Sequence, residues 1–167
     1  AQSPGRFPEP NSVSRLMAKM FDSGVYLFVN NPMKPAQKHF DEIFVRQRDE
    51  YSCGVACLAT VATIYGITVI DYDALRAQLK PMPKSGTSHE NMMSAAATFF
   101  PATEIGEHCY DGGVAVANIF DTDEDHYVVF LCREDDVILY YDPYYHEFVL
   151  TRVSEIEWVS GSNDTKC

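Results

Sequence analysis

Four polar residues of this chain have the side chains that a reactive thiol needs, although the sequence separates them widely. Cys53 begins an apolar segment, and Gln47 lies six residues before it. His126 and Asp142 stand at the ends of two later strand-like segments. A cysteine attacks a carbonyl carbon only as thiolate, and a helix N-terminus beside an imidazolium lowers the thiol pKa. An aspartate can orient the imidazole, and a neutral amide can donate a hydrogen bond to the oxyanion. The set therefore predicts acyl chemistry on a thiol, provided that the fold assembles it.

The segment that carries the cysteine is the strongest helix prediction. From Cys53 to Tyr65 apolar residues cover most of the helical circumference, which indicates a helix buried in the middle of a domain. Gly66 then supplies a C-terminal stop. The unpaired N–H groups of the first turn would stabilise a thiolate at Cys53, and Gly54 leaves room for a substrate carbonyl.

His126 and Asp142 lie in a region whose sequence pattern is typical of β-strands instead of helices. After Gly112-Gly113 four β-branched or aromatic runs follow, which predict strands over residues 114–120, 126–132, 137–141 and 147–151. Because His126 begins one strand and Asp142 ends the next, antiparallel pairing would bring them side by side. Pro143 would end the strand at that aspartate. Helices followed by an antiparallel sheet predict an α+β fold.

The remaining segments suggest one domain with an extension. Two amphipathic helices are expected over residues 71–79 and 88–100, the second capped by Ser88. A short helix over 12–20, a strand over 24–29 and a helical or irregular piece over 36–44 precede Gln47. We divide the chain into a flexible arm (1–11), an N-terminal extension (12–45), a catalytic domain (46–160) and a tail (161–167).

Composition excludes several classes of partner. The 167 residues carry a net charge of −11, so a nucleic acid would be repelled, whereas a basic substrate would be attracted. No apolar run approaches the roughly 20 residues of a membrane span. The five cysteines have no regular spacing, which argues against a disulfide framework and favours a reducing compartment, with the cytoplasm expected. Neither a metal nor a cofactor is expected.

Several motifs in the same order suggest a family. The chain resembles the bacteriocin-processing, or double-glycine leader, peptidases over roughly residues 45–155. The motifs are Gln47, Cys53-Gly-Val-Ala-Cys-Leu58, Tyr65-Gly66, Gly86-Thr-Ser88, His126-Tyr-Val-Val129 and Asp142-Pro143. The resemblance implies a papain-like fold with the nucleophile on the central helix and the histidine and aspartate on the sheet. It also implies that Cys53 is the nucleophile, His126 the base and acid, Asp142 its orienting partner and Gln47 an oxyanion-hole donor.

Further residues are expected to border the substrate, the turn at 86–88 by resemblance and Gly54 and Tyr144 from their positions beside Cys53 and Asp142 in the sequence. Gly54 and the turn Gly86-Thr87-Ser88 are expected at the cleft, and Tyr144, beside the aspartate, is expected to wall a peptide-binding groove. A peptide or protein substrate with a small residue beside the cleaved bond is implied. A capping turn and a tyrosine cover over the sheet are the structural alternatives for the turn and Tyr144.

Two features differ from the usual form of these bacterial proteins. Here 46 residues precede Gln47, and neither a membrane segment nor a nucleotide-binding loop follows. We therefore expect a stand-alone or excised domain. Two alternatives stay open: an effector or toxin of the same fold that deamidates or transamidates glutamine, and a catalytically idle module that binds peptides. An exported effector or a processed mature protein is the alternative to a cytoplasmic location.

Other residues compete for the histidine role. His39, His89 and His108 lack a strand-opening position with a partner acid. His146 lies close to Asp142 and is the reserve candidate, although we expect it at the surface. The acidic run Asp121–Asp125 before His126 is expected to form a solvated hairpin loop, or else to raise the histidine pKa or attract a basic substrate.

Overall fold

The computed structural model describes residues 40–67, 70–100, 114–121 and 124–158. The predictions that fall outside these ranges concern the arm, the 12–20 helix, the 24–29 strand, the first part of the 36–44 piece, His39, His108, the tail and part of the acidic run.

Three helices lie where the sequence predicts them. They are α4 (Cys53–Ile64), α5 (Tyr72–Leu79) and α6 (His89–Phe99). The side chain of Asp71 accepts a hydrogen bond from the N–H of Ala74, and that of Ser88 accepts one from Asn91, so both are N-caps. Gly66, with φ of +90°, follows the end of α4 in the left-handed region that favours glycine.

The second half of the described chain forms one antiparallel sheet. Its strands are β1 (Ala115–Asp121), β2 (Glu124–Glu134), β3 (Val137–Asp142), β4 (Glu147–Arg152) and β5 (Glu157–Trp158), in the spatial order β4-β3-β2-β1-β5. The expected α+β class is confirmed. Two details were not predicted: β5, which has only two residues, and the earlier start of β2.

The acidic run is partly strand rather than loop. Glu124 and Asp125 pair with Asp121 and Phe120 of β1, so β2 begins two residues before His126. Both acidic side chains are exposed. The loop prediction therefore fails for these positions, because the β1–β2 ladder extends past the histidine.

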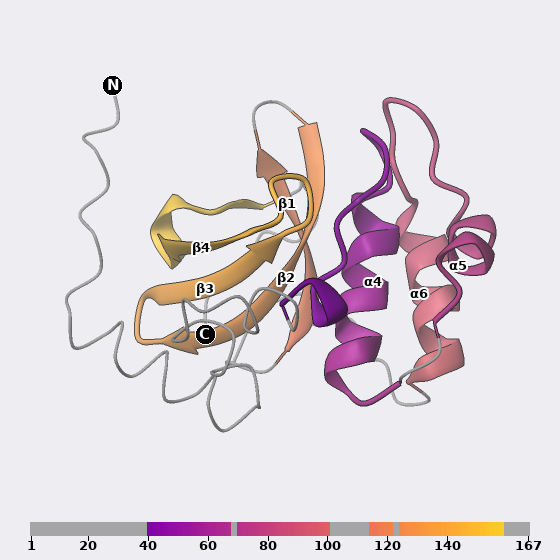
Figure 1. The fold of residues 1–167 in the computed structure, drawn as a ribbon. Helices are drawn as coiled ribbons and strands as arrows, with labels where there is room; N and C mark the ends of the chain where they lie inside the picture. The colour runs from indigo at the N-terminus through magenta and orange to yellow at the C-terminus, as the bar shows by residue number, and fades with distance from the viewer. Residues whose placement is uncertain (1–39, 68–69, 101–113, 122–123, 159–167) are drawn as a thin grey trace.

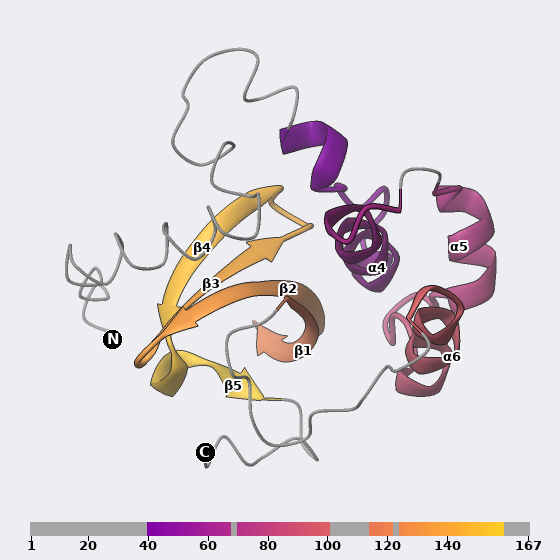
Figure 2. The ribbon, with the colours of Figure 1, turned by 90° about the horizontal axis from the view of Figure 1, so that it is seen from below.

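The helices gather on one side of the curved sheet, with α4 next to β2 (Figures 1 and 2). Residues 53–62 of α4 are all buried, as expected for a helix that is apolar nearly all round. Alternate residues of β2, Tyr127, Val129 and Leu131, join the core on the α4 side, and Val128 and Phe130 belong to a second cluster. Phe40 and Phe44 also join the first core, so the short helical turn at 40–43 packs on the domain.

Candidate active site

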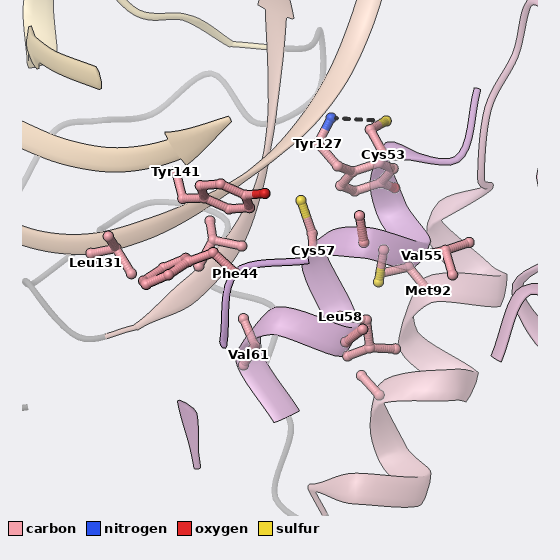
Figure 3. Close-up of a cluster of buried hydrophobic side chains, with 14 of the residues drawn as sticks. Phe44, Cys53, Val55, Cys57, Leu58, Val61, Met92, Tyr127, Leu131 and Tyr141 are labelled. Atoms are coloured by element: carbon pink, nitrogen blue, oxygen red, sulfur yellow. Dashed lines mark hydrogen bonds between the residues drawn. The ribbon is translucent and has the colours of Figure 1, made fainter. Parts of the chain in front are cut away.

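Cys53 is the first residue of α4 and is buried, with 6% of its surface exposed. Its Sγ accepts a hydrogen bond from the backbone N–H of Tyr127 on β2 at 3.5 Å (Figure 3). No side chain caps α4, because the Ser52 hydroxyl instead shares a 3.1 Å hydrogen bond with the Tyr72 hydroxyl. The first N–H groups of the helix are therefore not occupied by a capping oxygen and favour negative charge at the thiol.

His126 and Asp142 meet across β2 and β3. The register pairs Val129 with Tyr141, and its continuation places Asp142 opposite Val128, two residues from the histidine. His126 Nε2 and Asp142 Oδ1 are 2.9 Å apart, and their side chains are 14% and 5% exposed. The same carboxylate oxygen accepts a hydrogen bond from the N–H of Tyr144 at 2.8 Å. The aspartate is thus held in place at the turn that follows the strand.

The histidine also contacts the thiol. Burial by itself lowers the pKa of His126, but hydrogen bonds to Asp142 and Cys53, with the negative charges of both, raise this pKa to about 10. Because Nε2 is engaged by the aspartate, Nδ1 is the ring nitrogen left for the thiol. The arrangement favours the imidazolium form of His126 beside the thiol.

A second cysteine on the next turn of α4 has a different environment. Figure 3 shows Cys57 beside Phe44 and Tyr141, within the apolar core. Its pKa is raised well above the ordinary value, first by burial and then by the charges of Cys53 and Asp142. Cys57 is fully buried, and Cys132 is likewise buried on β2.

Gln47, six residues before Cys53 in the chain, is 9% exposed. Its backbone N–H donates to the carbonyl of Pro143 at 3.1 Å, which ties it to the turn beyond Asp142. Its side-chain Nε2 donates to the carbonyl of Asp49 at 2.8 Å, while the buried Oε1 has no hydrogen-bond partner. The N–H bond that remains on Nε2 is a donor without charge.

The turn at residues 86–88 packs against the start of α4. A Cβ on Gly54 would lie 3.0 Å from Met92 Cε and 3.1 Å from Thr87 Oγ1, so a larger residue would require these two side chains to move. Gly86 has φ of +62°, and the Thr87 hydroxyl is buried without a partner. Ser88 is engaged as the N-cap of α6. Tyr144, by contrast, is 47% exposed beside the aspartate.

His146 differs from the surface residue expected from the sequence. Its side chain is only 18% exposed, and Nε2 lies 2.7 Å from Asp41 Oδ1. Nδ1 lies 2.7 Å from the hydroxyl of Tyr141. The expectation fails because residues 40–44 pack over this turn, with the Phe40 ring 4.7 Å from the imidazole. His89, at the start of α6, is exposed.

Sequence reasoning missed two contributors to the site. The backbone N–H of Tyr127 reaches Cys53, and the carbonyl of Asp49 holds the Gln47 amide. A backbone group leaves no signal in residue type. For Asp49 a weak signal exists, because an aspartate two residues before Tyr51 can form a local turn through its side chain.

The described residues also limit what else the site could hold. Among them, no group of three or more histidine, cysteine, aspartate or glutamate residues is placed to hold a metal ion. No helix within the described ranges combines the length and apolar character needed to cross a membrane.

Comparisons with known proteins identify the relatives of this arrangement. The model of the peptidase C39 family matches residues 41–157. The peptidase domain of Streptococcus ComA, described as a bi-functional ABC transporter involved in quorum sensing, is similar in fold, with a TM-score of 0.53 and 19% identity. That match covers 70% of this chain and 90% of the ComA domain.

Two further results complete the comparison. A double-glycine motif protease from an AMS/PCAT transporter, solved with a leader peptide, gives a TM-score of 0.45 at 17% identity, over 66% of this chain and 79% of that one. No curated protein sequence matches. The expected papain-like fold and the resemblance to leader peptidases are both confirmed. Because the family model matches more than half of its residues, the chain belongs to the peptidase C39 family and is a cysteine peptidase.

Proposed function

We propose that the protein hydrolyses an amide bond of a peptide or protein through an acyl-thioester on Cys53. The observation that supports this most strongly is the continuous contact from the thiol through His126 to Asp142. The thiolate is the nucleophile, the imidazole moves the proton, and the carboxylate fixes the ring and balances its charge.

The Cys53 thiolate and the His126 imidazolium together account for each proton transferred in the proposed reaction. The Cys53 thiolate attacks the carbonyl carbon, and the C–O π electrons move to oxygen to give an oxyanion. When the C–N bond breaks, His126 gives its proton to the leaving amine and becomes neutral. It then takes a proton from water, whose oxygen attacks the thioester. Breakage of the C–S bond releases the acid and restores the thiolate and imidazolium.

Gln47 is the proposed oxyanion-hole donor. One N–H bond of Nε2 is used on Asp49, and the other remains for the developing oxyanion. The uncapped N–H groups at the start of α4 are the second source of donors. Removal of one such donor typically costs about 10²–10³-fold in rate.

The substrate surface is proposed from neighbours of the thiol. Gly54 lets Thr87 pack closely beside the nucleophile, so the turn of Gly86 and Thr87 is the proposed border of the cleft on this side. Tyr144 offers an exposed ring next to Asp142. The net charge of −11, with exposed Glu124 and Asp125 just before His126, favours a basic peptide.

The cellular setting is proposed from the thiols. Cys53, Cys57 and Cys132 are all free, which supports a reducing compartment such as the cytoplasm. An enzyme that depends on a thiolate also retains its nucleophile best there.

The first test is alkylation by iodoacetamide, located by peptide mass spectrometry across pH, in the wild type and in His126→Ala. We expect selective labelling of Cys53 below pH 7, slowed by the substitution. Cys57, in the same helix, is the internal control. Labelling of Cys53 that is no faster than labelling of Cys57, and indifferent to His126, would instead indicate the idle peptide-binding module.

Substrate cleavage then separates peptidase from deamidase. A mixed peptide library incubated with the enzyme should yield new N-termini, read by mass spectrometry. Conversion of glutamine side chains to glutamate without chain cleavage would contradict the peptidase proposal. The variant Cys53→Ala is the control for both products.

A further inference from the structure

The loop of residues 47–52, which joins Gln47 to Cys53, has no regular secondary structure. Its place is set by side-chain contacts with α5. A catalytic group on an irregular segment needs such support, because a displacement of about 1 Å can cost roughly 100-fold in rate. The residues that hold this loop are therefore candidates for a part in the reaction.

Arg76 of α5 makes the main contact with the loop. Its Nε and Nη2 donate to Asp49 Oδ2 at 3.3 and 3.1 Å, and Nη2 also lies 3.3 Å from the Tyr51 hydroxyl. The other carboxylate oxygen of Asp49 accepts from the N–H of Tyr51 at 3.1 Å. The side chains of Arg76 and Asp49 are 37% and 28% exposed, so this ion pair is partly shielded from solvent. Both oxygens of Asp49 are thus engaged, one toward α5 and one within the loop.

The backbone of the same aspartate holds the proposed oxyanion donor. Gln47 Nε2 donates to the Asp49 carbonyl at 2.8 Å, whereas the buried Oε1 has no partner. No hydrogen bond to the amide oxygen therefore fixes which end of the amide faces the site. If the Asp49 carbonyl moves, the amide can rotate and present its oxygen, which would repel an oxyanion instead of stabilising it.

We propose that Asp49 and Arg76 are positioning residues for the Gln47 amide: the ion pair fixes the Asp49 carbonyl, and the carbonyl keeps the amide N–H directed at the oxyanion. This inference rests on the oxyanion-hole role proposed for Gln47. Helix α5 contributes no group to the thiol–histidine pair. Under this inference it affects only the rate of the step in which the thiol attacks the carbonyl and the oxyanion forms.

Two reactions of the same thiol separate the carbonyl step from thiolate reactivity. Acylation of Cys53 by p-nitrophenyl acetate passes through an oxyanion, whereas alkylation by iodoacetamide does not. Both rates are measured in the full chain, by nitrophenolate release and by mass spectrometry of the Cys53 peptide. The variants are Gln47→Ala, Arg76→Met and Asp49→Asn, and Arg152→Met is the matched control.

The control removes an arginine of similar exposure. Arg152 pairs with Asp136 at 2.9 Å, with side chains 35% and 59% exposed, between β4 and the turn before β3. If Arg76→Met does not fold by circular dichroism, Arg76→Lys keeps the charge and loses only the forked contact.

We expect Gln47→Ala to slow acylation by about 100-fold and Arg76→Met and Asp49→Asn to slow it by roughly tenfold. Alkylation should stay within about twofold in all variants, and Arg152→Met should match the wild type in both reactions. In the Gln47→Ala background, Arg76→Met should cost nothing further, because the ion pair acts through the amide.

Three results would overturn the inference. One is acylation by Arg76→Met at the wild-type rate while Gln47→Ala is slow, which would leave the role of Gln47 intact. Another is an equal loss from Arg76→Met with and without Gln47, which would indicate a general structural effect. Acylation by Gln47→Ala at the wild-type rate would overturn both the proposed role of Gln47 and this inference.

Discussion

Two histidine–aspartate pairs flank the turn after β3, and they are alike in length and in the burial of the histidine, whereas Asp142 is buried and Asp41 is 55% exposed. His126 and Asp142 are 2.9 Å apart, and His146 and Asp41 are 2.7 Å apart. The two histidine side chains are 14% and 18% exposed. The pairs also differ in the third group, which is the Cys53 thiol for one ring and the Tyr141 hydroxyl for the other. A histidine–aspartate contact alone therefore does not distinguish the two rings, and we expect the third group to decide which of them takes part in chemistry.

The hydrogen bonds of His146 leave no nitrogen for proton transfer. The Tyr141 hydroxyl donates its hydrogen to the carbonyl of Val45 at 2.8 Å, so toward His146 it can only accept. The Asp41 carboxylate, when ionised, also only accepts. Both ring nitrogens of His146 are thus engaged, and the pair links residues 41–45, just before Gln47, to the end of β3.

The largest expected difference between the pairs is in catalysis by alanine variants. His126→Ala should lower kcat/KM for peptide cleavage by about 10³-fold or more, because the residue proposed as base and as imidazolium partner of the thiol is lost. His146→Ala should remain within about tenfold of the wild type. Steady-state cleavage of one peptide, with folding checked by circular dichroism, measures both. Equal losses in the two variants would contradict the distinction drawn from the third group.

Substitution of the two aspartates should also reduce activity unequally, with the larger loss again in the His126 pair but by a smaller factor than for the histidines. Asp142→Asn should reduce kcat by about 100-fold or more, since an amide can present its N–H to the ring and favour the wrong tautomer. Asp41→Asn should change kcat by less than about threefold, because the Asp41 side chain is 55% exposed and reaches no reacting group. Restoration of the carboxylate by Asp142→Glu would test geometry separately from charge. A reversed order of the two losses would exclude Asp142 as the orienting group.

The shifted pKa of His126 gives a prediction for stability. Its folded value of about 10 lies above the ordinary 6.5, so the native state binds this proton more tightly than the unfolded state does. The contribution is fully present below pH 6.5 and is lost as pH rises through about 10. Urea unfolding across this range should show wild-type stability falling more steeply than that of His126→Gln. Parallel curves would show that the histidine has no raised pKa.

Sequence and structure agree where the determinants are local. The apolar run from Cys53 predicts α4 because the apolar residues on all sides of the helix are visible in that segment alone. Ser88 was predicted as an N-cap from its position before a helical pattern, and the structure confirms it. His126 and Asp142 could be paired because consecutive antiparallel strands place the start of one near the end of the next.

The determinants that depend on packing between distant segments were not predicted. The burial of His146 requires residues 40–44 to pack over the turn after β3, and the sequence gives no sign of this contact. The anchor of Gln47 is a backbone carbonyl, held by an arginine 27 positions from Asp49 along the chain. Spacing alone cannot identify such partners, because nothing in residue type links a loop carboxylate to one particular arginine.

The smallest expected effect concerns the hydroxyl that distinguishes the His146 pair. Tyr141→Phe removes a donor to the Val45 carbonyl and an acceptor for His146 Nδ1, and leaves the buried ring in place. We expect a loss of about 1–3 kcal/mol in the free energy of unfolding, the range for a hydrogen-bonded group removed with its partners left behind. Urea titration measures it, and kcat should stay within about twofold because the ring still packs beside Asp142. A loss of activity larger than that from His146→Ala would mean that the hydroxyl acts on the site through Val45 and Gln47. Unchanged stability would instead show that the His146 pair does not fasten residues 41–45 to the sheet.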